Sequence, residues 1–365
     1  EEFNVKIAGE ITDFDPLSFF EHKESRKLDR YTMFAMIAAD QAIKSSGLDS
    51  SDVGVILGTG VGGMNTLEQE HTKLLKKGQR GVSPHFIPKM IPNIAGGQIA
   101  IKHGFHGPNF SLSTACSSAS DAIGMAYRLI QSNQIHAMVC GGAEGGITPL
   151  TLSGFSNMKA LSKNNENPQN ACKPFDKNRD GFIMSEGSAM LVLESLDNAK
   201  KRGATILAEI IGYGITNDAY HITQPHNEGL GATSAINLAL KDGGINKDEV
   251  NYINAHGTST YYNDMIETKA IKQVFGRDIA KNLLVSSTKS MTGHMLGATG
   301  AIEAITCIYA INNGIIPPTI NYETPDPECD LNYVPNKSIE SNLNITISNS
   351  FGFGGHNSVL ALKKF

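Results

Sequence analysis

Segments of strand length alternate with helical patterns along most of the chain, and this alternation is the feature that most limits its fold. In the second half the pattern predicts strands at 206–213, 250–254, 284–287, 344–348 and 358–362, with helices at 232–242, 264–274 and 300–310. In the first half, apolar runs of strand length occupy 53–57, 109–113, 137–142 and 188–194. Strands that alternate with helices form parallel sheets covered by helices. The sequence therefore predicts an α/β protein with two halves of one kind.

The two halves are expected to pack as one body. The 365 residues are 40% hydrophobic, which is enough to bury a large core, and no low-complexity tract or clear linker divides them. We expect an N-terminal half at 1–205 and a C-terminal half at 206–365. The polar stretch 164–180 is expected to be a long surface loop.

Bulk composition excludes several classes of protein. A net charge of −5 gives no global reason to expect nucleic acid as a partner, and no run of 18 apolar residues predicts a membrane span. The five cysteines are an odd number and include no C-x-x-C pair. This argues against a disulfide framework and for a soluble protein in a reducing compartment.

Residues 114–118, with the sequence TACSS, join a strand-like run at 109–113 to a helical pattern at 117–131. Unpaired N–H groups at a helix N-terminus favour the thiolate of a nearby cysteine, and they can also bind an oxyanion. Cys116 is therefore a candidate nucleophile. The alternative is a small buried hydrophobic residue, since free cysteine is often buried.

The glycine-rich segment 58–63 offers only a shifted near-match to the G-x-G-x-x-G motif of dinucleotide sites. No acidic residue follows about twenty positions later in a new strand, as that motif requires. We interpret these glycines as a tight turn near a site.

Three stretches of the second half carry groups that can serve Cys116. They are NAHGTST at 254–260, STKSMTGH at 287–294 and NSFGFGGHN at 349–357. Each follows an expected strand, and sites in open α/β sheets form at the carboxyl ends of strands. A single histidine is more often structural, but His256, His294 and Lys289 at equivalent strand ends favour a catalytic site.

These motifs, with the longer run STKSMTGHMLGATGAIEA, resemble the β-ketoacyl-acyl-carrier-protein synthases of type II fatty acid synthesis, in the I/II branch and most like synthase II. The similarity extends over nearly the whole chain. It implies a thiolase-like fold of two similar halves, each with a five-stranded, mostly parallel sheet, in α/β/α/β/α layers. It also implies a homodimer, and an acyl carrier protein as partner. We expect the family's opening strand to be missing from this sequence.

Two departures from the family pattern stand out. Tyr261 and Tyr262 occupy a turn that commonly carries proline. Cys116 is followed by Ser-Ser-Ala-Ser-Asp rather than by the commoner Ala-Thr-Gly-Thr-His type. Neither removes a catalytic group.

The resemblance implies an acyltransferase that performs a decarboxylative Claisen condensation of malonyl-carrier protein with an acyl group held on Cys116. The N–H groups of Cys116 and Phe353 are expected to bind the tetrahedral oxyanion, and two neutral imidazoles to donate Nε2–H to the enolate. A lysine–glutamate pair is expected to order the site. The implied catalytic residues are Cys116, His256, His294, Lys289, Glu303 and Phe353.

Substrate contacts follow from the same resemblance. Thr258 and Thr260 are expected to bind the amides of the pantetheine arm, and Val61, Phe86 and Phe155 to line an apolar acyl tunnel with Phe353 as its gate. The basic residues expected to dock the acidic carrier protein are Lys23, Arg26, Lys27, Arg80 and Lys159. The offsets between Lys23, Arg26 and Lys27 place them on one face if that segment is helical. No metal and no cofactor is expected beyond the phosphopantetheine that the substrates carry.

Alternatives remain open at this point. A polyketide-type ketosynthase has the same Cys and two His, and a non-catalytic acyl-binding subunit is disfavoured by Cys116. A thiolase would need a second cysteine as base, and a cysteine hydrolase would not need the second histidine and lysine. The richness in Asn, Lys and Ile suggests a bacterial cytoplasm or a plastid stroma.

Overall fold

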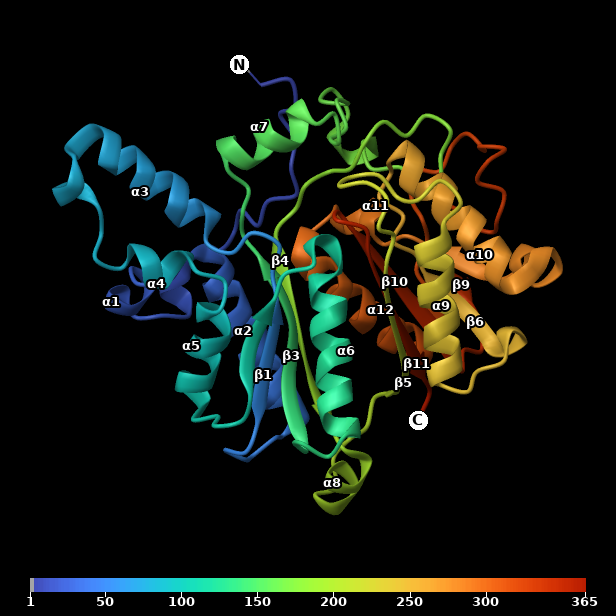
Figure 1. Cartoon of the computed structure of the whole chain (residues 1–365), viewed down its shortest axis with the longest axis horizontal. Coiled ribbons are helices and arrows are strands. Elements are labelled where there is room, and N and C mark those ends of the chain that lie inside the picture. Colours follow the sequence, from blue (N-terminus) through green and yellow to red (C-terminus); the bar gives the residue numbers. More distant parts are fainter. Residues whose placement is uncertain (1–2) are drawn as a thin grey trace.

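In the computed structural model, which describes residues 3–365, the N-terminal half contains a four-stranded sheet in the order β2-β1-β3-β4 (Figure 1). The strands are β1 (Gly54–Gly58), β2 (Asn109–Leu112), β3 (Ala137–Glu144) and β4 (Gly187–Glu194). The first three run parallel, and β4 runs antiparallel to β3. All residues of β1 and β3 are buried, as expected for strands covered on both faces.

The C-terminal half contains a five-stranded sheet in the order β5-β11-β10-β6-β7. Its strands are β5 (Glu209–Asn217), β6 (Val250–Asn254), β7 (Leu284–Ser286), β10 (Ile345–Gly352) and β11 (His356–Lys363). Only β11 runs against its neighbours, so both sheets are mostly parallel. A small ribbon pairs β8 (Ile315–Ile316) with β9 (Ile339–Glu340).

The prediction of five strands for the sheet of the N-terminal half is wrong. Within residues 3–365 this sheet has four strands. The segment around Gly9 runs beside the approach to β4 and makes a single bridge with Ser185. Arg30 bonds both Glu186 and the carbonyl of Ile11, so it holds this segment beside the residues that precede β4.

Helices lie in three layers around the sheets (Figure 1). The central layer holds α6 (Ser118–Gln131) and α12 (Thr299–Asn313), which share one buried apolar cluster with strands of both sheets. The outer layers hold α2 (Arg30–Ser46) and α5 (Ile94–His103) on one side and α9 (Leu230–Asp242) and α10 (Tyr261–Asn282) on the other. The predicted α/β/α/β/α layering is therefore confirmed.

The remaining helices are α1 (His22–Ser25), α3 (Met64–Lys77), α4 (Phe86–Met90), α7 (Pro149–Asn157), α8 (Leu196–Lys201) and α11 (Lys289–Thr292). None of the helices within residues 3–365 has the length and apolar character needed to cross a bilayer.

The stretch 164–180 is only in part the surface loop that its polar composition predicts, because residues 166–169 are exposed and residues 174–176 are buried. Phe175 and Arg179 are buried in it. Phe175 stacks on Tyr333 with ring centroids 4.0 Å apart, and Arg179 bonds Asp326 at 2.6 Å and lies 3.6 Å from Asp264. Phe175 and Arg179 are therefore buried because their partners lie in distant segments of the chain.

Candidate active site

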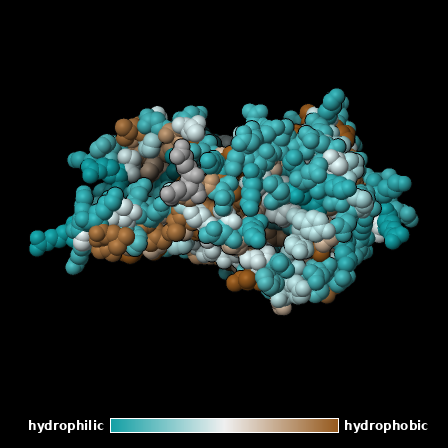
Figure 2. Space-filling model, turned by 90° about the horizontal axis from the view of Figure 1, so that it is seen from above, coloured by the Kyte–Doolittle hydropathy of each residue, from teal (hydrophilic) through white to brown (hydrophobic). Residues whose placement is uncertain are grey.

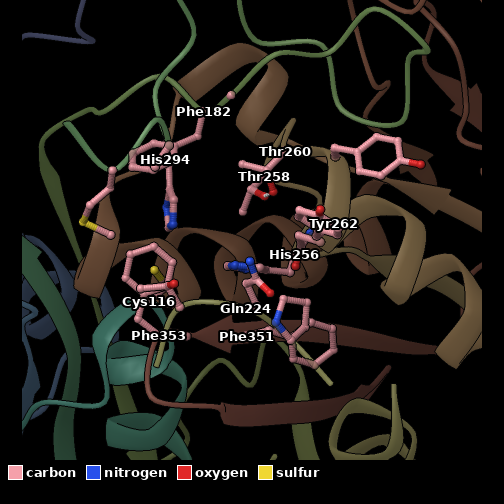
Figure 3. Close-up of a pocket in the computed structure, with 18 of the residues that line it drawn as sticks. Cys116, Phe182, Gln224, His256, Thr258, Thr260, Tyr262, His294, Phe351 and Phe353 are labelled. Carbon is pink, nitrogen blue, oxygen red and sulfur yellow. Dashed lines mark hydrogen bonds between the residues drawn. The ribbon is translucent and has the colours of Figure 1, made fainter. Parts of the chain in front are cut away.

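Cys116, His256, His294 and Phe353 come from segments far apart in the sequence and meet in one pocket (Figure 3). His256 follows β6, His294 follows α11, and Phe353 follows β10. Cys116 lies in a short 3₁₀ turn, Ala115–Ser117, between β2 and α6. All four positions lie at or beyond the carboxyl ends of parallel strands, where sites form in α/β proteins.

The reactive atoms of this pocket are close together. The sulfur of Cys116 and one ring nitrogen each of His256 and His294 lie within 4.8 Å of one another. The two imidazole rings are 5.5 Å apart and nearly perpendicular. The pocket has a volume of about 540 Å³, which is large enough for an extended arm and a short acyl group.

Cysteine and histidine are also zinc ligands, so the trio has to be tested against a metal site. Ligand atoms around one zinc ion lie about 3.5 Å apart, given bonds of roughly 2.0–2.3 Å in a tetrahedron. The Cys116 sulfur and the two ring nitrogens lie within 4.8 Å of one another, a wider limit than the zinc spacing. The Lys289 ammonium also lowers the pKa of both imidazoles. This arrangement suits a carbonyl carbon beside the sulfur and an oxygen between the imidazoles better than a cation.

The turn that carries Cys116 is strained. Ala115 has a φ of 53°, in the left-handed region that residues other than glycine rarely adopt. Gly352 passes close beside it, since a Cβ there would lie 2.6 Å from the carbonyl oxygen of Thr114 and 3.1 Å from the Cys116 nitrogen. The glycine therefore lets the end of β10 approach the turn that carries Cys116.

Burial raises the pKa of the Cys116 thiol to about 12, although the Lys289 ammonium and a hydrogen bond from the Phe353 N–H act in the opposite direction. In this pocket without substrate, burial therefore favours the thiol over the thiolate that the sequence predicts from the helix N-terminus. Loss of hydration outweighs the partial charge of the helix end. A nearby base has to take the thiol proton when the nucleophile reacts.

Both histidines are buried and neutral. Burial, with the Lys289 ammonium as the next contribution, lowers the pKa of His256 and of His294 well below the usual 6.5. Nδ1 of His294 lies 2.9 Å from the Thr299 hydroxyl. If that hydroxyl donates, the His294 proton is on Nε2, which is free to donate into the pocket. Nδ1 of His256 has no partner among the described residues, so either tautomer is open to it.

Lys289 and Glu303 form an ion pair behind the histidines. Nζ lies 2.5 Å from Oε1, and both side chains are fully buried. Burial raises the pKa of Glu303 to about 7, and Lys289 acts against that rise. Burial is the main reason that both imidazoles are neutral, and the charge on Lys289 lowers their pKa further.

The loop that carries His256 is held from α10. Glu267 accepts hydrogen bonds from the N–H groups of His256 and Gly257, each at 2.8 Å, and Asp264 accepts one from Thr258 at 3.0 Å. Both carboxylates are buried. These two residues therefore support the loop through bonds to its backbone N–H groups.

Thr258 and Thr260 line the outer part of the pocket, with their hydroxyl oxygens 2.8 Å apart. Tyr261 and Tyr262 line the same part and are about half exposed. Figure 3 shows the two threonines and Tyr262 on the side of the pocket away from Cys116. An extended arm that reaches Cys116 from this side would pass both hydroxyls.

The expected acyl-tunnel residues separate into two groups. Phe155 lines the pocket, 5.4 Å from the ring of Phe182 and 6.4 Å from that of Phe353. Val61 and Phe86 are not among the residues that line this pocket, so their place on an acyl tunnel stays a prediction. The backbone of Val61 is bonded to Glu144, and Phe86 begins α4.

Several pocket residues were missed by the sequence reasoning. They are Phe182, Gln224, Leu296 and Phe351. Phe182 and Gln224 lie outside the motifs named above, and only the tertiary structure brings them to the pocket. Leu296 and Phe351 lie within motifs of the second half in which other residues were the predicted site residues.

The expected docking cations are all exposed but do not share a helix face. The helix α1 has only four residues, so Arg26 caps its C-terminus and Lys27 lies beyond it. The prediction of a common helical face is therefore wrong. Arg80 lies in a short turn after α3, and Lys159 lines the pocket mouth. Lys89, whose Nζ is 3.4 Å from the Arg26 carbonyl, adds a cation that the sequence reasoning missed.

Comparisons with known proteins agree with this geometry. The model for the beta-ketoacyl synthase N-terminal domain matches residues 2–199, and that for the C-terminal domain matches 207–323. A 3-oxoacyl-[acyl-carrier-protein] synthase 2 of Synechocystis sp. is 52% identical over 99% of this chain and 88% of its own. The enzyme of the same name from Staphylococcus aureus is 49% identical over 100% of this chain and 89% of its own.

Solved structures show the same fold. A type II PKS acyl-carrier protein in complex with its ketosynthase, the latter bound to the hexaketide, matches with a TM-score of 0.91 and 33% identity, over 100% of this chain and 89% of that one. The family models, the identities and the shared fold together show that this chain belongs to the beta-ketoacyl synthase family.

Proposed function

We propose that this chain is a 3-oxoacyl-[acyl-carrier-protein] synthase, which condenses malonyl-carrier protein with an acyl chain during type II fatty acid elongation. It is an acyltransferase of class EC 2.3.1. The observation that carries the proposal is the convergence of the Cys116 sulfur with two neutral imidazoles inside 4.8 Å.

In the first half-reaction, the Cys116 sulfur attacks the carbonyl carbon of an acyl thioester. His256, which is free to take either tautomer, accepts the thiol proton and passes it to the departing pantetheine thiolate. The N–H groups of Cys116 and Phe353 hold the oxyanion. One thioester is formed and one is broken, and the thiol proton ends on the released carrier arm.

In the second half-reaction, malonyl thioester loses carbon dioxide, and the electron pair of the broken C–C bond forms an enolate. Nε2–H groups of His256 and His294 donate to the enolate oxygen. The enolate carbon then attacks the acyl-Cys116 carbonyl, and Cys116 leaves as a thiolate that regains a proton from water. Lys289, paired with Glu303, adds its charge to the burial that keeps both imidazoles neutral.

The proposed substrate contacts follow the pocket walls. Thr258 and Thr260 bind the pantetheine amides, Phe155 and Phe182 face the acyl chain, and Phe353 gates it. The chain needs no cofactor of its own, because the substrate carries the phosphopantetheine. The acidic carrier protein docks on the basic residues Lys23, Arg26, Lys27, Arg80 and Lys159.

The proposed assembly is a homodimer. β2 is an edge strand, and its residues are half-buried or exposed in the single chain. Apolar side chains are exposed on the neighbouring α3 and α4, including Leu75 and Ile87. Figure 2 shows apolar surface gathered near that end of the molecule. An open edge beside apolar surface favours pairing with a second copy.

The proposed domain division places the nucleophile in the half 1–205 and the two histidines in the half 206–365.

The five cysteines are all free, which suits a reducing compartment such as a bacterial cytoplasm or a plastid stroma.

The second candidate function is a polyketide-type ketosynthase, which the similarity in fold to such enzymes supports. Identity separates the two, since it is 49–52% to fatty acid enzymes and 33% to these ketosynthases. An acyl-binding subunit without activity is disfavoured by Cys116.

The experiment that tests the function follows labelled acyl groups by mass spectrometry of the intact protein. Incubation with acyl-carrier protein should acylate wild type and leave Cys116→Ser unmodified. Adding malonyl-carrier protein should then release carbon dioxide and one 3-oxoacyl product that is two carbons longer. Repeated extension without reduction would favour the polyketide reading, and normal acylation of Cys116→Ser would contradict the nucleophile.

A further inference from the structure

Asp121 lies on α6, five positions after Cys116. Its side chain is only 2% exposed. No ion pair within residues 3–365 involves it. A buried carboxyl group without a cation is costly unless hydrogen bonds satisfy it. The hydrogen bonds of Asp121 therefore have to satisfy this buried carboxyl group beside Cys116.

The hydrogen bonds of Asp121 lead to both sides of the nucleophile. Oδ2 accepts from the Thr114 hydroxyl at 2.5 Å and lies 3.3 Å from the Ser117 hydroxyl. Thr114 and Ser117 flank the two residues of the strained turn, Ala115 and Cys116. The carboxylate thus fixes the turn at its entry and at its exit.

Local hydrogen bonds also support the turn, including those from the Ser117 hydroxyl to the Thr114 carbonyl at 2.8 Å and to the Thr114 hydroxyl at 3.1 Å. The Thr114 N–H donates to the Ser118 hydroxyl at 2.9 Å, and that hydroxyl donates to the Ala115 carbonyl at 2.7 Å. The left-handed φ of Ala115 persists only where the surroundings over-determine it. Losing the carboxylate would free the Thr114 side chain to rotate and the turn to relax.

The other carboxylate oxygen reaches the C-terminal half. Oδ1 accepts from the hydroxyl of Tyr213, on β5, at 2.7 Å. Tyr213 is itself held by Asp242, which accepts from its N–H, and by Arg128, which donates to its carbonyl. Gly124, on the same helix as Asp121, admits the Tyr213 ring, because a Cβ there would lie 2.4 Å from ring carbons.

We propose that Asp121 is a positioning residue that holds the Cys116 turn in its reactive geometry through Thr114 and Ser117, with Tyr213 fixing the carboxylate from the other half. The role rests on the proposed function of Cys116 as the nucleophile. Asp121 does not touch the substrate. It aims the sulfur and the Cys116 N–H at the point where the acyl carbonyl binds.

The test compares Asp121→Ala, Thr114→Val and the double variant in the full-length protein. Each single variant should slow acyl transfer to Cys116 by about 10–100-fold, since misplacing a reacting group by about 1 Å has effects of this size. The double variant should be no slower than the slower single variant, because both remove the same contact. Asp121→Asn, which keeps an acceptor oxygen for Thr114, should restore most of the rate.

A second readout separates positioning from general destabilisation. Malonyl decarboxylation, which depends on His256 and His294, should change less than threefold in Asp121→Ala at a temperature well below its unfolding midpoint. The matched control is Asp29→Ala, which removes another carboxyl group that is 2% exposed and bonded to a threonine, Thr66. This control should leave acyl transfer within threefold of wild type.

The proposal is overturned if Asp121→Ala acylates at the wild-type rate, if it slows both half-reactions equally, or if the effects of the two single variants multiply. Iodoacetamide alkylation of Cys116, followed against pH, keeps the test independent of the proposed function. Should wild type accept no acyl group, an altered alkylation profile in Asp121→Ala and Thr114→Val would still support the positioning role.

Discussion

Cys116, His256 and His294 show how burial sets the protonation state of individual residues. Burial raises the pKa of the thiol to about 12 and lowers that of both imidazoles well below 6.5. Each shift favours the neutral form, as desolvation requires. The resting pocket therefore holds a thiol and two neutral rings beside a buried lysine–glutamate pair.

The first prediction at this scale concerns His294. Replacing it with alanine should lower the rate of malonyl decarboxylation by about 10²–10³, the usual effect of removing one oxyanion donor. Acyl transfer to Cys116 should fall much less, because His256 remains to accept the thiol proton. Carbon dioxide release and intact-protein mass measure the two steps separately. Equal damage to both would mean that His294 activates Cys116.

The second prediction concerns pH. Because the folded-state pKa of His294 is depressed, the unfolded chain binds its proton first as the pH falls through 6.5. The neutral ring therefore contributes stability above that pH, and this contribution is lost below it, at up to about 1.4 kcal/mol per pH unit. His294→Gln lacks this group, so its stability relative to wild type should improve from pH 7.5 to 5.5.

Chemical denaturation of wild type and His294→Gln at several pH values measures the difference in their free energies of unfolding. Subtracting one from the other cancels the contributions of opposite sign that both proteins share. Glu144 and Glu303 provide such contributions, since burial raises the pKa of each to about 7. An imidazole NMR signal that titrates near 6.5 in folded wild type and is absent from His294→Gln would contradict the shift.

At the scale of elements, the short α1, the turn after α3 and the helix α4 present separate cations near one another in the fold. Arg26 and Lys27 at the end of α1 are linked to α4 by the contact between Lys89 and the Arg26 carbonyl. Their proximity is thus tertiary and does not depend on a long helix. Local positive charge on a chain of net charge −5 can guide an acidic partner.

Charge reversal tests this docking surface. The triple change Arg26→Glu, Lys27→Glu and Arg80→Glu should raise the KM for acyl-carrier protein about tenfold or more and flatten its salt dependence. Turnover of a short acyl-pantetheine thioester should stay within twofold. Reversal of three exposed cations of the other half, Lys241, Lys247 and Arg277, is the control. Equal loss with the carrier-free substrate would show that the residues support the fold.

At the scale of the whole molecule, two sheets enclose α6 and α12, and the open edge of the N-terminal sheet at β2 remains for a second copy. Sedimentation should give a particle of twice the 39.1 kDa chain mass. Ser111→Lys on β2 should shift it toward monomer, because a charged side chain on an edge strand opposes edge pairing. Ser132→Lys, at the end of α6, should remain dimeric. A wild-type monomer at micromolar concentration would contradict the assembly.

The sequence by itself determined most of the elements and their order. The strand at 250–254 has the predicted bounds, and the helices after Cys116 and before β8 begin within one residue of prediction. Such elements are local, because the period of apolar residues selects helix or strand before any distant contact forms. The motifs around Cys116, His256 and His294 likewise identify the chemistry from residue types in short segments.

Only the tertiary structure decided what depends on distant neighbours. It drew Arg179 inward to Asp326, kept Val61 and Phe86 off the pocket walls, and reversed the expected ionisation of Cys116. It also joined Asp121 to Tyr213 across the two halves. Burial, hydration and hydrogen-bond partners are properties of the packed molecule, and residues far apart in sequence acquire them only when the halves close on each other.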